Sequence, residues 1–151
     1  MLAKVHSAQV SGLQPQLIDV EIDVSRGLHN FSIVGLPDKA VEEARDRISA
    51  AIKNSGFPSP LKSNRRIIVS LAPADIKKEG PAFDLAIALA YLQANQYVKF
   101  DAGKKIFLGE LALEGTVRPI KGALMMAQHA KQKGFKEIFV PEANAREIAL
   151  I

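Results

Sequence analysis

The sequence predicts a single α/β (α+β) domain over residues 1–151, in which helices pack against a β-sheet. Some segments alternate apolar and polar residues as strands do, and others repeat apolar residues at helical spacing. Hydrophobic residues make up 48% and charged residues 24% of the 151 residues, which is the balance of a globular protein. The chain holds no repeat and no low-complexity segment that would indicate another kind of architecture.

The first strands and the first helix follow from residues 17–56. Leu17–Val24 alternates strictly between apolar and acidic side chains, which predicts a strand with one face in the core. Phe31–Val34 predicts a second strand, which ends at the Gly and Pro of residues 35–37. Asp38 is then a good N-cap for a helix whose apolar residues recur at helical spacing, and Gly56 suits the end of that helix.

The middle of the chain predicts a buried strand and a central helix. Ile67–Ala72 is nearly all apolar, as expected for a strand that is buried within the sheet. A polar loop follows over residues 74–80. Phe83–Leu92 is apolar almost all round, so we expect a helix in the centre of the core, with Leu89 buried in it.

The last third predicts a hairpin, a helix, a strand and a final helix. Ile106–Leu113 and Thr116–Ile120 flank Glu114-Gly115, which indicates a tight turn between two strands. Apolar residues at helical spacing follow from residue 123 until Gly134. A strand over residues 138–140 precedes a helix that is still running at residue 151, so we expect the chain to be a fragment of a longer protein.

Composition excludes several classes of protein. The chain has no Cys, so it has no disulfide framework, no thiolate zinc site and no cysteine nucleophile. The first ten residues lack the long apolar stretch of a signal peptide. No segment approaches the roughly 18 apolar residues of a membrane span, so we expect a cytoplasmic protein with no membrane partner. Aromatic residues are 6% with no Trp, which argues against a base-stacking surface.

Basic residues are concentrated in the second part of the chain. Residues 61–151 hold fourteen basic and nine acidic residues, a net charge of +5 within a total of +4. Such a basic half can attract DNA or an acidic partner, or it can simply be a solvated surface. We expect the pair at residues 65–66 and the pair at 77–78 to cluster, because they flank one strand-loop unit. The candidate contact residues are Lys62, Arg65, Arg66, Lys77, Lys78 and Lys121.

Few residue patterns suggest catalysis or metal binding. Asp19, Glu21 and Asp23 share one strand face, where neighbours two apart are about 6.8 Å from each other, so a cation would need further oxygen ligands. The three histidines lie far apart in sequence, and no phosphate loop of the form GxxxxGK[ST] is present. A helix start at residues 80–82 could hold an anion, but Asp84 in its first turn would repel one. We assign no metal and no cofactor to these residues.

Four stretches together resemble a known family. They are Phe31–Asp38, Asn54–Phe57, Leu71–Gly80 and Gly109–Leu113. The combination is similar to the N-terminal domain of the YifB/ComM family of magnesium-chelatase-like AAA+ ATPases, over essentially the whole chain. The resemblance implies a cytoplasmic homo-oligomer, hexameric at full length, that acts on DNA in branch migration and natural transformation. It also implies that ATP and Mg²⁺ bind to a downstream AAA+ module, which would be this domain's own partner.

Gly80-Pro81 before a buried helix, then Gly109-Glu110, Pro119-Ile120 and Gly134 carry a more distant resemblance, since they are similar in order to the Lon protease domain and the RadA C-terminal domain. It implies a mixed sheet with packed helices, as in the second domain of ribosomal protein S5. Lon-type peptidases use a Ser nucleophile and a Lys base, and the matching positions here are Ala82 and Met126. Ala has no hydroxyl and Met has no titratable nitrogen, so neither half of the dyad can work.

These observations favour a non-catalytic domain that serves an AAA+ motor through assembly and through contact with DNA or a partner protein. One alternative is an enzyme, either a Lon-like Ser-Lys peptidase or a small-molecule phosphotransferase. The other alternative is a chelatase-type subunit that assists metal insertion. The missing dyad and the missing phosphate loop argue against the enzymes, and no residue pattern indicates a porphyrin or metal site.

Overall fold

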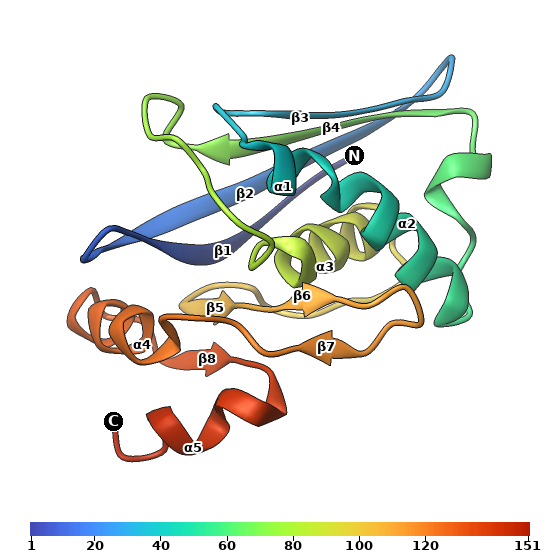
Figure 1. The fold of residues 1–151 in the computed structure, drawn as a ribbon. Helices are drawn as coiled ribbons and strands as arrows, with labels where there is room; N and C mark the ends of the chain where they lie inside the picture. Colours follow the sequence, from blue (N-terminus) through green and yellow to red (C-terminus); the bar gives the residue numbers. More distant parts are fainter.

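The computed structural model describes all residues 1–151 and contains a six-stranded mixed sheet with helices packed on it (Figure 1). The strand order is β3-β4-β2-β1-β5-β8. Three strand pairs are parallel, β3 with β4, β1 with β5 and β5 with β8, and the other two are antiparallel. The strands are β1 Leu2–Ser11, β2 Gln14–Arg26, β3 Asn30–Val34, β4 Arg65–Ala72, β5 Lys105–Phe107 and β8 Glu137–Phe139. The predicted α/β fold with a mixed sheet is therefore confirmed.

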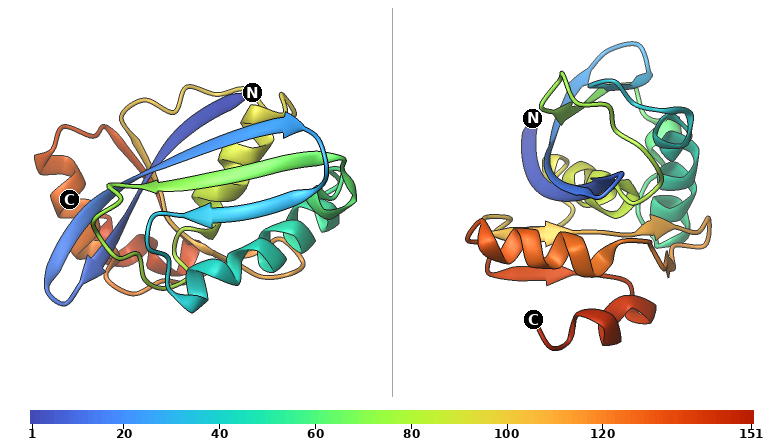
Figure 2. Two further views of the ribbon diagram at one scale, coloured as in Figure 1. Left: turned by 90° about the horizontal axis from the view of Figure 1, so that it is seen from above. Right: turned by 60° about the vertical axis from the view of Figure 1, so that its left-hand side comes forward.

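The helices lie on one side of the long strands (Figures 1 and 2). The helix predicted after Asp38 is present but interrupted, because Glu43 separates two helices. Asp38 is its N-cap, as predicted: its carboxylate accepts a hydrogen bond of 2.8 Å from the backbone N–H of Val41. The helices are α1 Lys39–Glu42, α2 Ala44–Asn54, α3 Asp84–Ala94, α4 Ala123–Gln132 and α5 Ala145–Ile148, with short 3₁₀ turns at Pro60–Lys62 and Glu142–Asn144. None of these helices is long and apolar enough to span a membrane.

β1 and β2 form a long hairpin, of which the sequence predicted only the second strand. The alternation over residues 17–24 is confirmed, because Ile18, Val20, Ile22 and Val24 point inward and are at most 1% exposed. β1 lacks so clear an apolar pattern, because two of its inward-facing residues are the polar Ser7 and Gln9. Both are hydrogen-bonded inside the protein, which is how a strand can bury polar side chains.

β4 corrects the expectation of a strand buried on all sides. Ile67, Val69 and Leu71 are fully buried beneath the helices, whereas Ile68 points to the other face and is 38% exposed. The reason is that β4 lies between β3 and β2, and all three helices next to it cover the same face of the sheet. The opposite face of β4 is open to solvent.

The main core surrounds α3, which lies between the long strands and a small hairpin of β6 (Glu110–Leu111) and β7 (Val117–Arg118) (Figure 1). Ala86, Ile87 and Ala90 of this helix are fully buried, which confirms its central position. Leu85 and Leu89 are only half-buried, so the helix is not enclosed all round as its sequence indicated. A smaller, separate core beneath α4 consists of Ala8, Ile106, Leu108, Met126 and Ala130.

The segment 106–113 is not one strand, contrary to the prediction. Its first residues belong to β5 in the large sheet, and the chain then turns away to form β6 (Glu110–Leu111), which pairs with β7 (Val117–Arg118). The change of direction occurs at Gly109, where a Cβ atom would lie 2.4 Å from a side-chain methyl of Val117. The predicted turn at Glu114-Gly115 is confirmed, with the backbone N–H of Gly115 donating to the carbonyl of Ala112.

Candidate functional site

A groove lies where β1, the turn into α1, the loop before α3 and the start of α4 meet. It has a volume of about 710 Å³ and holds both positions of the missing dyad, Ala82 and Met126, although they are distant in sequence. The fold therefore brings these two positions to one site, as the resemblance to Lon implied. The lining residues are Gln9, Val10, Asp38, Glu79, Gly80, Pro81, Ala82, Pro119, Ile120, Lys121, Gly122 and Met126.

Hydrogen bonds fix one wall of the groove to the sheet and to α1. The second carboxylate oxygen of Asp38 accepts from the backbone N–H of Gly80 at 3.1 Å, so one side chain caps α1 and holds the loop before α3. The Gln9 side chain accepts from the backbone N–H of Glu79 at 3.0 Å and donates to the carbonyl of Lys77 at 2.8 Å. The loop is thus held by two side chains from other elements.

The opposite wall is the start of α4, which approaches β1 closely. Gly122 has a φ of +79°, and a Cβ there would lie 2.9 Å from a methyl of Val10, so this position requires glycine. Met126 follows one turn later and is 1% exposed within the small core. The two positions that the Lon resemblance matches to a serine and a lysine therefore carry a methyl at the groove and a buried thioether, and neither can act in peptide hydrolysis. Lys121 is exposed at its rim.

A buried ion pair, which sequence reasoning missed, lies behind the groove at the start of α3. Asp84 is buried and accepts two hydrogen bonds from the Arg47 guanidinium of α2, at 2.6 and 2.9 Å. It also accepts one at 3.0 Å from the backbone N–H of Leu111 in β6. Burial raises the pKa of Asp84, and the hydrogen bonds from Arg47 oppose that rise. The hydrogen bonds to Asp84 raise the pKa of Arg47, which stays charged.

Lys78 corrects the prediction of a basic contact surface at residues 77–78. Its side chain is fully buried, and its amine donates to the carbonyls of Gly35, at 2.7 Å, and Pro73. Burial lowers the pKa of Lys78, and the negative charge of Asp75 opposes that shift. The amine therefore joins the loop after β3 to the loop after β4 and cannot reach an external partner.

The remaining predicted basic residues do not form one cluster. Arg65 and Arg66 begin β4, whose two ends, Arg65 and Ala72, are about 23 Å apart at about 3.3 Å per residue, and Lys77 lies in the loop beyond Ala72. The expectation that they cluster is therefore wrong, because an extended strand separates its ends. Lys62 lines another hollow together with Asp46 and Lys53.

Arg26 does lie beside the arginines of β4, and the sequence analysis did not single it out. In the antiparallel pairing of β2 with β4, Arg26 is directly opposite Arg65, and Ser25 is opposite Arg66. A hollow at this place is lined by Arg26, Gly27, Leu28, Asn64 and Arg65. Only the register between β2 and β4 brings Arg26 next to Arg65, and no sequence pattern gives that register.

Two of the three acidic side chains on the outer face of β2 have partners within the chain. Asp19 is 3.3 Å from the amine of Lys4 and 2.8 Å from the ring nitrogen of His6, both on β1. Asp23 is 3.5 Å from the N-terminal ammonium group. No group of three or more His, Cys, Asp or Glu side chains is placed to hold a metal ion.

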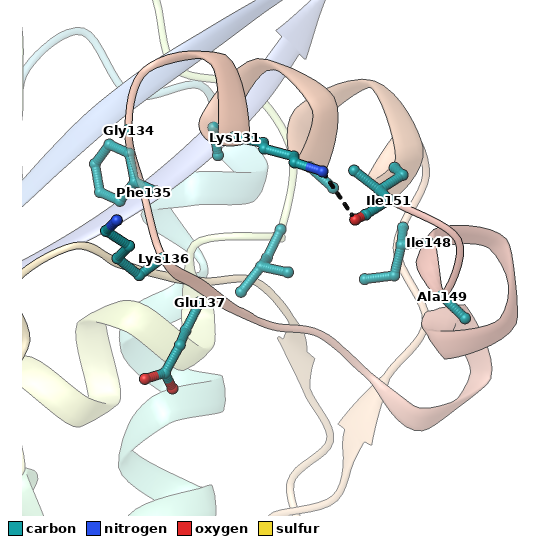
Figure 3. Close-up of a pocket in the computed structure, with 11 residues that line it drawn as sticks. Lys131, Gly134, Phe135, Lys136, Glu137, Ile148, Ala149 and Ile151 are labelled. Carbon is teal, nitrogen blue, oxygen red and sulfur yellow. Dashed lines mark hydrogen bonds between the residues drawn. The ribbon is translucent and has the colours of Figure 1, made fainter.

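A further hollow lies between α4, β8 and the last residues of the chain (Figure 3). Figure 3 shows Ile148 and Ile151 on one side of it and Phe135 across from them. The amine of Lys131, one of the two lysines that line the hollow, donates to the carbonyl of Ile151 at 3.2 Å. Its walls are mainly apolar and hold no arrangement suited to chemistry.

Comparisons with known proteins show which proteins this chain is similar to. Residues 20–144 match the family model described as subunit ChlI of Mg-chelatase. The chain is 41% identical over 151 residues to the competence protein ComM of Haemophilus influenzae, and 41% identical over 153 residues to the uncharacterized protein YifB of Escherichia coli. Each match covers 99% of this chain and 29% of the relative. The Lon protease 2 of Thermus thermophilus is 31% identical over 136 residues, 86% of this chain and 16% of that protein.

Proposed function

Since the chain belongs to the family of the Mg-chelatase subunit ChlI and is related to ComM and YifB, we propose that it is a non-catalytic domain of an AAA+ ATPase that processes DNA. The observation that carries the proposal is the 41% identity to a competence protein over 99% of this chain. In this role the domain supports assembly of a homo-oligomer, hexameric in the whole protein, and contacts DNA or a partner protein in branch migration during natural transformation. The setting is the cytoplasm.

The division of labour in this proposal follows from the residues present. Residues 1–151 contain no phosphate loop of the form GxxxxGK[ST], so ATP and Mg²⁺ are assigned to a separate AAA+ module. The chain spans 29% of the length of ComM, which leaves room for such a module in the relative. The groove has Ala82 and Met126 in place of a dyad, so the domain contributes no peptide hydrolysis.

ATP hydrolysis by the whole protein and by residues 1–151 tests the proposal. We expect the whole protein to hydrolyse ATP in the presence of Mg²⁺, faster when branched DNA is added. We expect residues 1–151 alone neither to hydrolyse ATP nor to bind it at micromolar concentration in calorimetry. Nucleotide binding by the short chain, or a whole protein without DNA-stimulated hydrolysis, contradicts the assignment.

A Lon-like peptidase is the alternative that a specific observation favours, since the groove holds both dyad positions. A fluorogenic peptide assay compares the natural chain with the double variant Ala82→Ser, Met126→Lys. Our proposal requires no cleavage by the natural chain, whereas cleavage by it would establish the alternative. A chelatase-type subunit, the other alternative, would show stabilisation by the metal ion that it handles, and a thermal unfolding series with Mg²⁺ and other divalent ions tests that.

A further inference from the structure

We infer that the arginine end of the sheet, defined as Arg26 at the end of β2 with Arg65 and Arg66 at the start of β4, binds the phosphate groups of a nucleic-acid backbone. The inference rests on the proposed function, because it names the part of the domain that touches DNA. The turn from β2 to β3 and the beginning of β4 lie together at one end of the sheet (Figures 1 and 2). The other predicted basic residues are elsewhere.

The register of the strands concentrates positive charge at this end. Arg26 and Arg65 are directly opposite one another, which puts their α-carbons about 5 Å apart. Arg66, paired with Ser25 on one side and Asn30 on the other, adds a third charge at the same end of the sheet, but its side chain points to the opposite, open face. Like charges directly opposite in an antiparallel pair destabilise a sheet. An anion bound between the guanidinium groups would relieve that repulsion.

No carboxylate of the protein neutralises these three side chains. The chain's ion pairs involve the N-terminus, Lys4, His6 and Arg47, and none involves Arg26, Arg65 or Arg66. The nearest acidic side chain along β2, that of Asp23, pairs with the N-terminal ammonium group. The hollow that Arg26 and Arg65 line has no acidic lining residue. The contrast with Arg47, whose charge is fully matched by Asp84, shows that this end is free for an external anion.

The details of the hollow fit phosphate. A 2.9 Å hydrogen bond from the guanidinium of Arg65 to the side chain of Asn95 holds Arg65 in place. Less side-chain entropy is therefore lost when Arg65 binds a phosphate. Arg26 and Arg66 are exposed and can turn their planar forks toward phosphate oxygens. Leu28 is 91% exposed at the rim, where an apolar side chain can contact sugar or base. No aromatic residue lines the hollow, so the contact is to the backbone rather than through stacking.

Fluorescence anisotropy with labelled duplex and single-stranded DNA at 50 and 200 mM NaCl tests this inference. Three neutralised duplex phosphates give a salt slope of about −2.7, so natural-chain affinity should fall about 40-fold between these concentrations. The variant Arg26→Gln, Arg65→Gln, Arg66→Gln should lose at least about tenfold in affinity at 50 mM and become nearly independent of salt. The control Lys77→Gln, Lys121→Gln, Lys133→Gln removes the same charge elsewhere and should keep its affinity within about threefold.

Each other outcome overturns the inference. Absence of DNA binding at 50 mM NaCl does so directly, and so does equal weakening by the two triple variants. Displacement of DNA by polyglutamate at equal charge concentration would identify an acidic protein segment as the partner instead. If Arg65→Gln impairs folding, seen by circular dichroism, the exposed pair Arg26→Gln, Arg66→Gln gives the same test. DNA-stimulated ATP hydrolysis by the whole protein is scored separately, so the proposed function can stand when the arginine end fails.

Discussion

Arg47 and Asp84 join four elements, α1, α2, α3 and β6, through one network of hydrogen bonds. The guanidinium donates to both carboxylate oxygens and to the carbonyl of Ala40, while Asp84 also accepts from β6. Sequence reasoning assigned Asp84 to the helix dipole and had no reason to select Arg47. Two charges that are 37 residues apart give no local signal, because only the packing of α2 on α3 brings them together.

Removing one member of this pair should be costly. Asp84→Ala leaves the Arg47 charge without its partner, and we expect the free energy of unfolding to fall by about 3–5 kcal/mol. Urea denaturation measures the change. The exposed neighbour Asp46→Ala should change stability by less than about 0.5 kcal/mol. The double variant Arg47→Met, Asp84→Leu should recover much of the loss, and a double variant as unstable as Asp84→Ala would show that the charge itself is not the cause.

The buried amine of Lys78 should make the free energy of unfolding depend on pH, in a direction that its pKa shift determines. Its folded-state pKa is lowered by burial, so between that value and the ordinary pKa of 10.5 the folded chain has lost a proton that the unfolded chain still holds. The free energy of unfolding should therefore gain a contribution as pH rises through this alkaline window. Lys78→Met should lack that contribution in denaturation series between pH 7 and 10, and Lys77→Met should retain it. Identical profiles for the two variants would contradict the assignment.

At the scale of elements, substitutions in α3 test which of its residues lie in the core. Ile87 is fully buried in the main cluster, and we expect Ile87→Ala to lower the free energy of unfolding by about 2–5 kcal/mol. Leu89, which the sequence placed in the core, is half-buried, and Leu89→Ala should cost clearly less, because part of its apolar surface is already in water. Chemical denaturation of both variants decides, and a larger loss at Leu89 would contradict this description of the helix.

Elements with a single dominant pattern could be predicted from sequence. β2 alternates, α3 is apolar, and Asp38 caps a helix, and each of these properties depends on neighbouring residues only. β1 was missed because polar residues face inward, and β5 and β6 were merged because the chain leaves one sheet for another at Gly109. Such features depend on what lies across the fold, which local periodicity does not record.

At the scale of the whole molecule, the candidate site shows the same limit. The family resemblance pointed to Ala82 and Met126, and the fold places both on one groove. The basic residues chosen by proximity in sequence were separated by the length of β4, and one of them, Lys78, is inside the protein. Arg26 entered only through strand register. Counting charges shows that the second part of the chain is basic. The pairing of strands in the fold determines which of these charges lie on the same surface.

The large sheet is joined at one narrow place, because β1 and β5 share a single residue pair, His6 with Ile106. Beyond it lie β5, β8 and α4, which surround the smaller core together with Ala8 of β1, while β1 to β4 enclose the larger core. A protein built in this way can open in stages, with the smaller part detaching first as a cooperative unit. We expect amide hydrogens of β8 and α4 to exchange with deuterium faster than those of β2 and β4 under native conditions, measured by mass spectrometry on peptic fragments. If the amide hydrogens of both parts were equally protected, residues 105–148 would unfold together with the larger core despite the single residue pair of His6 and Ile106.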